Sequence, residues 1–219
     1  MKCIHCGNQT SKLAEWKLRD ENVVCYDCCE AVLKKNEDAL KQKYVFLNNL
    51  CVLSYEDFKK IDDNPELALN CIQDDMLAVS PFKEFQKKLL FKRIEWMGRW
   101  SKTIKTAVLL CENYLEVSKV FQRSIGKRVL TSKKLNYSEI AVINVVYKPT
   151  KWQLGLACLV AIISLVSFNL IGMLLTAFLL WQSHGYEIRI KSKDGEIVSV
   201  PIKSKKDDNV LELLNLVGM

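Results

Sequence analysis

The pattern of apolar and polar positions changes several times along the 219 residues. Residues 152–183 form an almost wholly apolar run that contains no acidic, basic or histidine side chain. Elsewhere the apolar residues recur with a period of two or of about 3.6, which is typical of half-buried strands and amphipathic helices. The pattern therefore predicts a mixed α+β protein interrupted by one hydrophobic segment.

Strand patterns occur on both sides of this run. Residues 114–121 alternate apolar and polar side chains, and residues 137–147 are rich in β-branched residues. After the run, residues 186–192 alternate again, Asp194 and Gly195 supply a tight turn, and residues 196–200 return as a second strand.

These strand sets are too short to form stable sheets separately, so we expect one split antiparallel β-domain over residues 106–219. The apolar run at 152–183 is its insertion. The chain then ends in a helix from about Asp207, with an apolar stripe made by Val210, Leu213, Leu214 and Val217.

The uncharged run is long enough for a membrane-spanning helix, which needs about 20 residues. Lys148 precedes it and Arg189 follows it, so positive charge on both sides places both ends in the cytoplasm. Two helices of about 15 residues would each reach about 22 Å, which favours a hairpin dipping in from the cytoplasmic leaflet and bending near Asn169 and Gly172. The alternatives are a single tilted transmembrane helix and a buried soluble core. The expected location is the cell membrane, with both soluble parts cytoplasmic.

The middle of the chain, residues 41–105, is predicted to be helical. Ser54 is expected to cap a short helix together with Asp57, and Ser80 and Pro81 are expected to begin a longer one. That longer helix carries aromatic and leucine side chains near helical spacing, interleaved with basic ones. It is interpreted either as a core helix with a solvated basic face or as a helix lying on an anionic leaflet.

Four of the nine cysteines form the most specific pattern in the chain, namely Cys3, Cys6, Cys25 and Cys28. Each pair has two intervening residues, and 18 residues separate the pairs, as in tetrahedral zinc sites. The N-terminal residues show no signal-peptide core, so we expect a reducing compartment in which such thiols bind metal. A redox Cys-x-x-Cys motif is the alternative, but it needs only one pair.

The ligand set leaves no coordination position for water, so the predicted Zn²⁺ is structural. His5 is expected to point away from the metal, and Cys29 would break the two-residue spacing. A hairpin between the two pairs and a helix after Cys28 complete a zinc ribbon over residues 1–40.

The net charge of +7 suits anionic lipid or nucleic acid, and the apolar run favours lipid. The ribbon itself is close to charge balance. The sequence contains no phosphate-binding glycine loop and no nucleophile-elbow motif. The two histidines, His5 and His184, lie in unrelated contexts, so the chain is not expected to be an enzyme.

Two segments resemble known families. The block from Lys2 to Gly7, with the later pair at Cys25 and Cys28, resembles the short zinc ribbons of uncharacterised bacterial proteins. Residues 135–140, the apolar run and then residues 186–190 resemble bacterial pleckstrin-homology-like (PH-like) domains that carry a helical-hairpin insertion. The resemblance implies a fold but no reaction.

These observations predict a non-catalytic, membrane-associated adaptor that faces the cytoplasm. Its expected partners are membrane lipid and a protein bound through the zinc ribbon. The alternative function is a nucleic-acid-binding regulator tethered to the membrane.

Overall fold

The computed structural model describes residues 1–97, 100–123, 128–167 and 169–217. It is a mixed α+β structure with three antiparallel sheets and several helices. The chain groups into two compact units. The first comprises Met1–Gln86 and Ser118–Ser132, and the second comprises Lys87–Val117 and Lys133–Met219. The predicted boundaries at residues 40 and 105 stay predictions.

The first unit begins with the predicted hairpin. Strand β1 (Glu15–Lys17) pairs antiparallel with β2 (Val23–Cys25), and Trp16 lies opposite Val24. The turn between them places Glu21 at a positive φ of 67°. Helix α1 (Tyr26–Lys34) follows β2 without a linker, so the second cysteine pair lies at the junction of strand and helix.

Short helices complete the first unit: α2 (Glu37–Lys41), α3 (Lys43–Asn49), η1 (Leu50–Val52), α4 (Tyr55–Asp63) and η2 (Pro65–Cys71). The predicted cap is confirmed, because the Ser54 hydroxyl accepts from the Asp57 N–H and the Asp57 carboxylate accepts from the Ser54 N–H. Leu33, Phe46 and Phe58 are buried in the core of this unit.

The predicted helix beginning at Ser80 is wrong, and so is a helical region extending to residue 105. The chain instead forms β3 (Lys87–Met97) and β4 (Trp100–Leu110), a long antiparallel pair. Leu89, Phe91 and Arg93 are buried, whereas the residues between them are exposed, which is the period of a strand. The exposed positions include the apolar Leu90 and Ile94, which concealed this period in the sequence.

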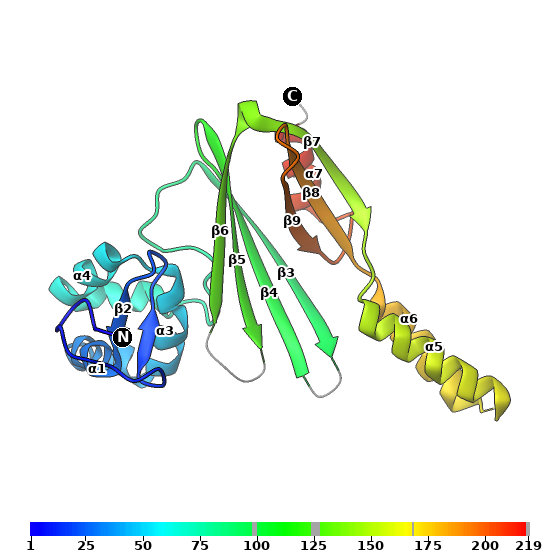
Figure 1. Cartoon of the computed structure of the whole chain (residues 1–219), viewed down its shortest axis with the longest axis horizontal. Helices are drawn as coiled ribbons and strands as arrows, with labels where there is room; N and C mark the ends of the chain where they lie inside the picture. Colours follow the sequence, from blue (N-terminus) through cyan, green and yellow to red (C-terminus); the bar gives the residue numbers. More distant parts are fainter. Residues whose placement is uncertain (98–99, 124–127, 168, 218–219) are drawn as a thin grey trace. The chain divides into compact units, whose positions relative to one another are not determined.

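Strands β3 and β4 form a four-stranded sheet together with β5 (Tyr114–Arg123) and β6 (Val129–Asn136), in the order β3-β4-β5-β6. A second sheet has the order β7-β8-β9, with β7 (Ile140–Tyr147), β8 (Tyr186–Ser192) and β9 (Ile197–Ile202). In this sheet Tyr147 lies opposite Tyr186, so strands from the two sides of the insertion pair directly (Figure 1). The predicted pairing across the insertion is therefore confirmed.

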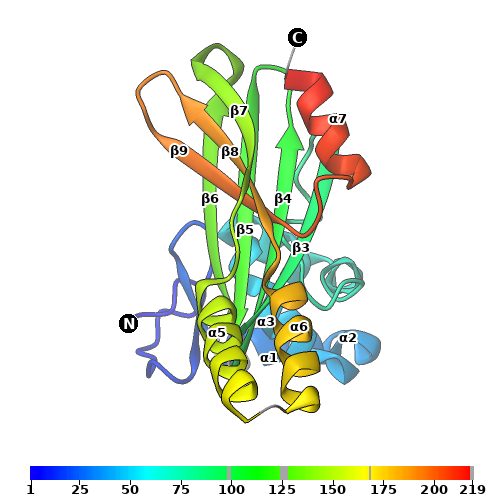
Figure 2. The same cartoon turned by 90° about the vertical axis from the view of Figure 1, so that its right-hand side faces the viewer.

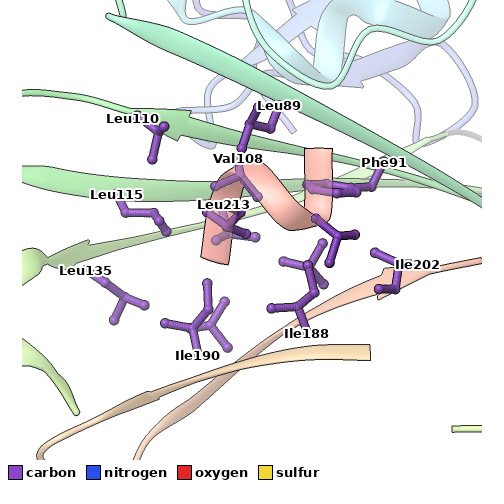
Figure 3. Packing of buried hydrophobic residues seen from close by; sticks show 14 residues of the cluster. Leu89, Phe91, Val108, Leu110, Leu115, Leu135, Ile188, Ile190, Ile202 and Leu213 are labelled. Atoms are coloured by element: carbon purple, nitrogen blue, oxygen red, sulfur yellow. The ribbon is translucent and has the colours of Figure 1, made fainter. Parts of the chain in front are cut away.

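The core of the second unit joins strands of both sheets to the last helix, α7 (Asp208–Val217). Leu213 lies among side chains from β3, β4, β8 and β9 (Figure 3). Val210 and Leu213 are buried and Leu214 is partly buried, which agrees with the predicted apolar stripe. The side chain of Val217, which was assigned to the same stripe, lies outside the described residues.

The insertion forms two helices that lie side by side, α5 (Lys151–Val166) and α6 (Leu170–Ser183) (Figure 2). The Asn169 side chain accepts hydrogen bonds from the N–H groups of Ile171 and Gly172, at 3.0 and 3.3 Å. This N-cap begins α6, so the predicted bend at Asn169 is confirmed.

The predicted membrane location is wrong. No helix among the described residues is long and apolar enough to cross a membrane. The physical reason is the Asn169 cap, which divides the uncharged run into helices of 16 and 14 residues. At 1.5 Å per residue these reach about 24 and 21 Å, less than the roughly 30 Å of a hydrocarbon core.

Candidate metal centre

Backbone hydrogen bonds shape the first cysteine pair into a tight loop. The Gly7 N–H donates to the Cys3 carbonyl at 2.9 Å, and the Cys3 N–H donates to the Asn8 carbonyl at 2.9 Å. Gly7 has φ +77°, a conformation that glycine adopts without steric cost. The Ile4 N–H donates to the Val23 carbonyl at 2.9 Å and thereby fixes this loop to β2.

The second pair is positioned by a strand and a helix. Cys25 ends β2 and is the N-cap of α1, and Cys28 lies in the first turn of that helix. The two sulfurs therefore face the first loop from a rigid junction. Cys3, Cys25 and Cys28 are buried, whereas Cys6 is exposed.

All four sulfurs lie within 4.8 Å of one another. The Cys3 and Cys28 sulfurs are 3.9 Å apart, and those of Cys6 and Cys25 are 3.7 Å apart. Sulfurs bound tetrahedrally at about 2.3 Å from zinc are separated by about 3.8 Å, whereas disulfide sulfurs are about 2.0 Å apart. The spacing fits four ligands of one metal ion and does not fit a disulfide.

The local environment shifts the pKa values of the cysteine thiols in different directions. Burial acts to raise the pKa of Cys3, but backbone N–H groups of Cys6, Cys25 and His5 outweigh it and lower that pKa to about 7. One of these N–H groups, that of Cys25, lies 3.3 Å from the Cys3 sulfur. Burial raises the pKa of Cys25, and burial together with the neighbouring sulfurs raises that of Cys28. A cation bound by all four thiolates would displace these protons.

The two residues that adjoin the ligand pattern take other roles. The His5 Nε2 lies 3.7 Å from an Asp62 carboxylate oxygen, and its ring meets Phe58 edge-on at 5.4 Å between centroids. Cys29 is fully buried on α1, and this burial raises its pKa. Among the described residues, the sulfur cluster contains only the four cysteines expected to be ligands.

The other histidine, His184, belongs to the second unit. Its Nδ1 lies 2.8 Å from the Leu180 carbonyl, and its ring packs edge-on against Tyr147. The two histidines therefore lie in separate units.

Sequence reasoning missed the contacts that brace the ribbon against helix α4. The Tyr55 N–H donates to the Asp20 carboxylate at 2.8 Å, and the Arg19 N–H donates to the Leu53 carbonyl at 2.8 Å. The sequence does not reveal the Asp20 contact, because a hydrogen bond spanning 35 residues leaves no periodic signal.

The chain matches no protein-family model, no curated protein sequence and no solved structure.

Proposed function

We propose that Cys3, Cys6, Cys25 and Cys28 bind one structural Zn²⁺, and that the first unit is a non-catalytic module that binds another protein. The observation that carries the metal assignment is the pair of sulfur separations, 3.7 and 3.9 Å, at the edge length of a zinc–sulfur tetrahedron. Four thiolates leave no coordination position for a reacting water, which supports a structural role.

Exposed apolar side chains support a protein partner. In the ribbon, Met1 is 70% exposed, Ile4 46% and Leu13 88%. Ile4 lies between the first two ligands, so metal binding would fix the loop that presents it. Residues 1–40 carry six basic and seven acidic side chains, a balance that disfavours the phosphate contacts of nucleic-acid binding.

The second unit is proposed to be a PH-like domain with a helical-hairpin insertion. Support comes from the pairing of β7 with β8 across the insertion and from the terminal helix α7 that packs on strands of both sheets. This assignment concerns the fold and implies no ligand.

The metal assignment is tested by measuring zinc in the purified full-length chain by mass spectrometry. We expect one zinc per chain, with loss of most of it in Cys28→Ser. The matched control is Cys158→Ser, because Cys158 is an exposed cysteine on α5 outside the cluster. Equal zinc contents in the two variants would overturn the metal assignment.

The binding role is tested by placing a photo-crosslinking side chain at Leu13 in cells and identifying the adducts. We expect one recurring protein adduct that disappears in Cys28→Ser. A control crosslinker at Glu37, on the exposed start of α2, should not give it. If no recurring protein adduct forms at Leu13, or if the chain instead shifts labelled RNA at low salt, the protein-binding proposal fails. An adduct that persists in Cys28→Ser would overturn the dependence of this binding on the metal.

A further inference from the structure

A cavity of about 570 Å³ lies within the second unit, at the base of the α5–α6 hairpin. Four segments line it: strand β3, the residue before α5, the end of α6 and the segment after β9. Strand β3 is an edge strand of its sheet. The volume lies within the range of pockets that bind small molecules, about 300–1,000 Å³.

The described lining residues carry positive charge and no acidic group. Lys92, Arg93 and Lys203 all line the cavity. Arg93 is only 7% exposed, and its guanidinium donates to the Lys148 carbonyl at 3.1 Å and to the Thr150 hydroxyl at 3.1 Å. These bonds fix a charged group in the wall of the cavity.

One acidic group nearby offsets part of this charge. A Glu95 carboxylate oxygen lies 3.5 Å from the Arg93 Nε, although Glu95 itself does not line the cavity. The two lysines remain as additional positive charge. The cavity therefore favours an anion over a neutral or cationic group.

The N-terminal end of α5 reinforces this preference. Thr150, the N-cap of α5, lines the cavity, and the first turn of α5 contains no acidic residue. The partial positive charge of this helix end adds to the basic side chains. The C-terminal end of α6 also lines the cavity, and its partial negative charge acts in the opposite direction.

An exposed aromatic ring forms another part of the wall. Trp181 lines the cavity and is 67% exposed, and the Lys203 Nζ lies 5.9 Å from its ring centroid. An indole face beside an ammonium group suits a ligand in which a flat ring is joined to an anionic group.

We propose that this cavity binds a small organic anion that combines an aromatic ring with a phosphate or carboxylate group. Arg93 fixes the anion-binding wall, Lys92 and Lys203 contact the oxyanion, and Trp181 stacks on the ring. The ligand class follows from the cavity alone and does not depend on the zinc site.

The test uses isothermal titration of the full-length protein with 1-naphthyl phosphate. We expect one site per chain that weakens as salt is raised. The variant Lys92→Gln/Lys203→Gln should bind about tenfold more weakly, a change of about 1.4 kcal/mol. Lys193→Gln is the control for lysine charge, because Lys193 is exposed in the β8–β9 turn and does not line the cavity.

Neutral 1-naphthol and inorganic phosphate measure separately how much the aromatic ring and the oxyanion contribute to binding. Each should bind at least about tenfold more weakly than 1-naphthyl phosphate if both halves contribute. Equal binding of naphthol would indicate adsorption to apolar surface and would overturn the proposal. So would an undiminished affinity in the double variant, or no heat of binding at millimolar probe.

Discussion

Gly172 of α6 lies directly against Ser164 of α5, so closely that a β-carbon at Gly172 would stand 2.0 Å from the Ser164 hydroxyl oxygen. The Ser164 hydroxyl donates to the Val160 carbonyl, and its side chain is 3% exposed. The two helices of the insertion therefore approach each other closely at a point where both side chains are small.

We expect Gly172→Ala to force the two helices apart and to destabilise the hairpin by about 1–3 kcal/mol. The matched control is Gly155→Ala, since a β-carbon there meets nothing within 4 Å and alanine favours a helix. Hydrogen exchange of residues 151–183 would measure the effect. Equal protection in the two variants would contradict it, and adding Ser164→Gly to Gly172→Ala should restore protection.

Removal of zinc should unfold about the first 40 residues and leave the second unit folded. A segment of about 40 residues rarely folds on its own core, so we expect the folding of the ribbon to depend on the proposed zinc. Hydrogen exchange after treatment with a zinc chelator should show loss of protection at β1 and β2 but not at β8. Protection at β1 that survives complete removal of the metal would contradict this expectation.

Glu187 on β8 should make the stability of the second unit depend on pH. It is 4% exposed, and although burial opposes ionisation, hydrogen bonds from Lys148 and Ser199 and the charges of Lys148 and Arg189 lower its pKa. A carboxyl whose pKa is lower in the folded state stabilises the fold above its unfolded pKa of about 4.3. This stabilisation is lost as the pH falls from that value through the folded pKa.

The variant Glu187→Gln should therefore lower the free energy of unfolding by about 1–3 kcal/mol at pH 7. The difference from the natural chain should shrink below about pH 4.3. Glu196→Gln serves as the control, because Glu196 pairs with Lys133 at an exposed position and contributes at most about 1 kcal/mol. Chemical denaturation at several pH values would detect the change, and a difference that does not vary with pH would argue against it.

Replacing residues 149–184 by a two-residue Asn-Gly turn should preserve the β7–β8 pair. The Lys148 N–H already donates to the Gly185 carbonyl at 2.9 Å, so the two strand ends lie at hairpin distance. The natural chain exposes many large apolar side chains on α5 and α6, including Leu159, Ile162, Leu174 and Phe178. Exposed apolar patches of this kind promote association, so we expect the shortened chain to self-associate less.

Sedimentation would compare the two chains, and circular dichroism would report whether the strands persist. The prediction fails if the shortened chain loses its strand signal. It also fails if both chains sediment alike.

Local chemistry was enough to predict several features. Two Cys-x-x-Cys pairs can form one sulfur cluster because each short loop brings its sulfurs onto one side, and the structure places them together. The Ser54–Asp57 cap and strand β8 were likewise predictable, because their signals lie within a few neighbouring residues.

Only the tertiary structure decided the features that depend on distant partners. Residues 87–97 and 100–110 form a strand pair because Leu89 and Phe91 pack against β4 and other segments of the core, although apolar residues on the exposed face concealed the period of two. Arg93 is buried on β3 because the Tyr186 and Lys148 carbonyls, from segments more than 50 residues away, accept its hydrogen bonds. The sequence by itself determined the features that depend on neighbouring residues, such as the cysteine pairs, the Ser54 cap and strand β8. Long-range packing determined which faces of the helices and strands lie against one another.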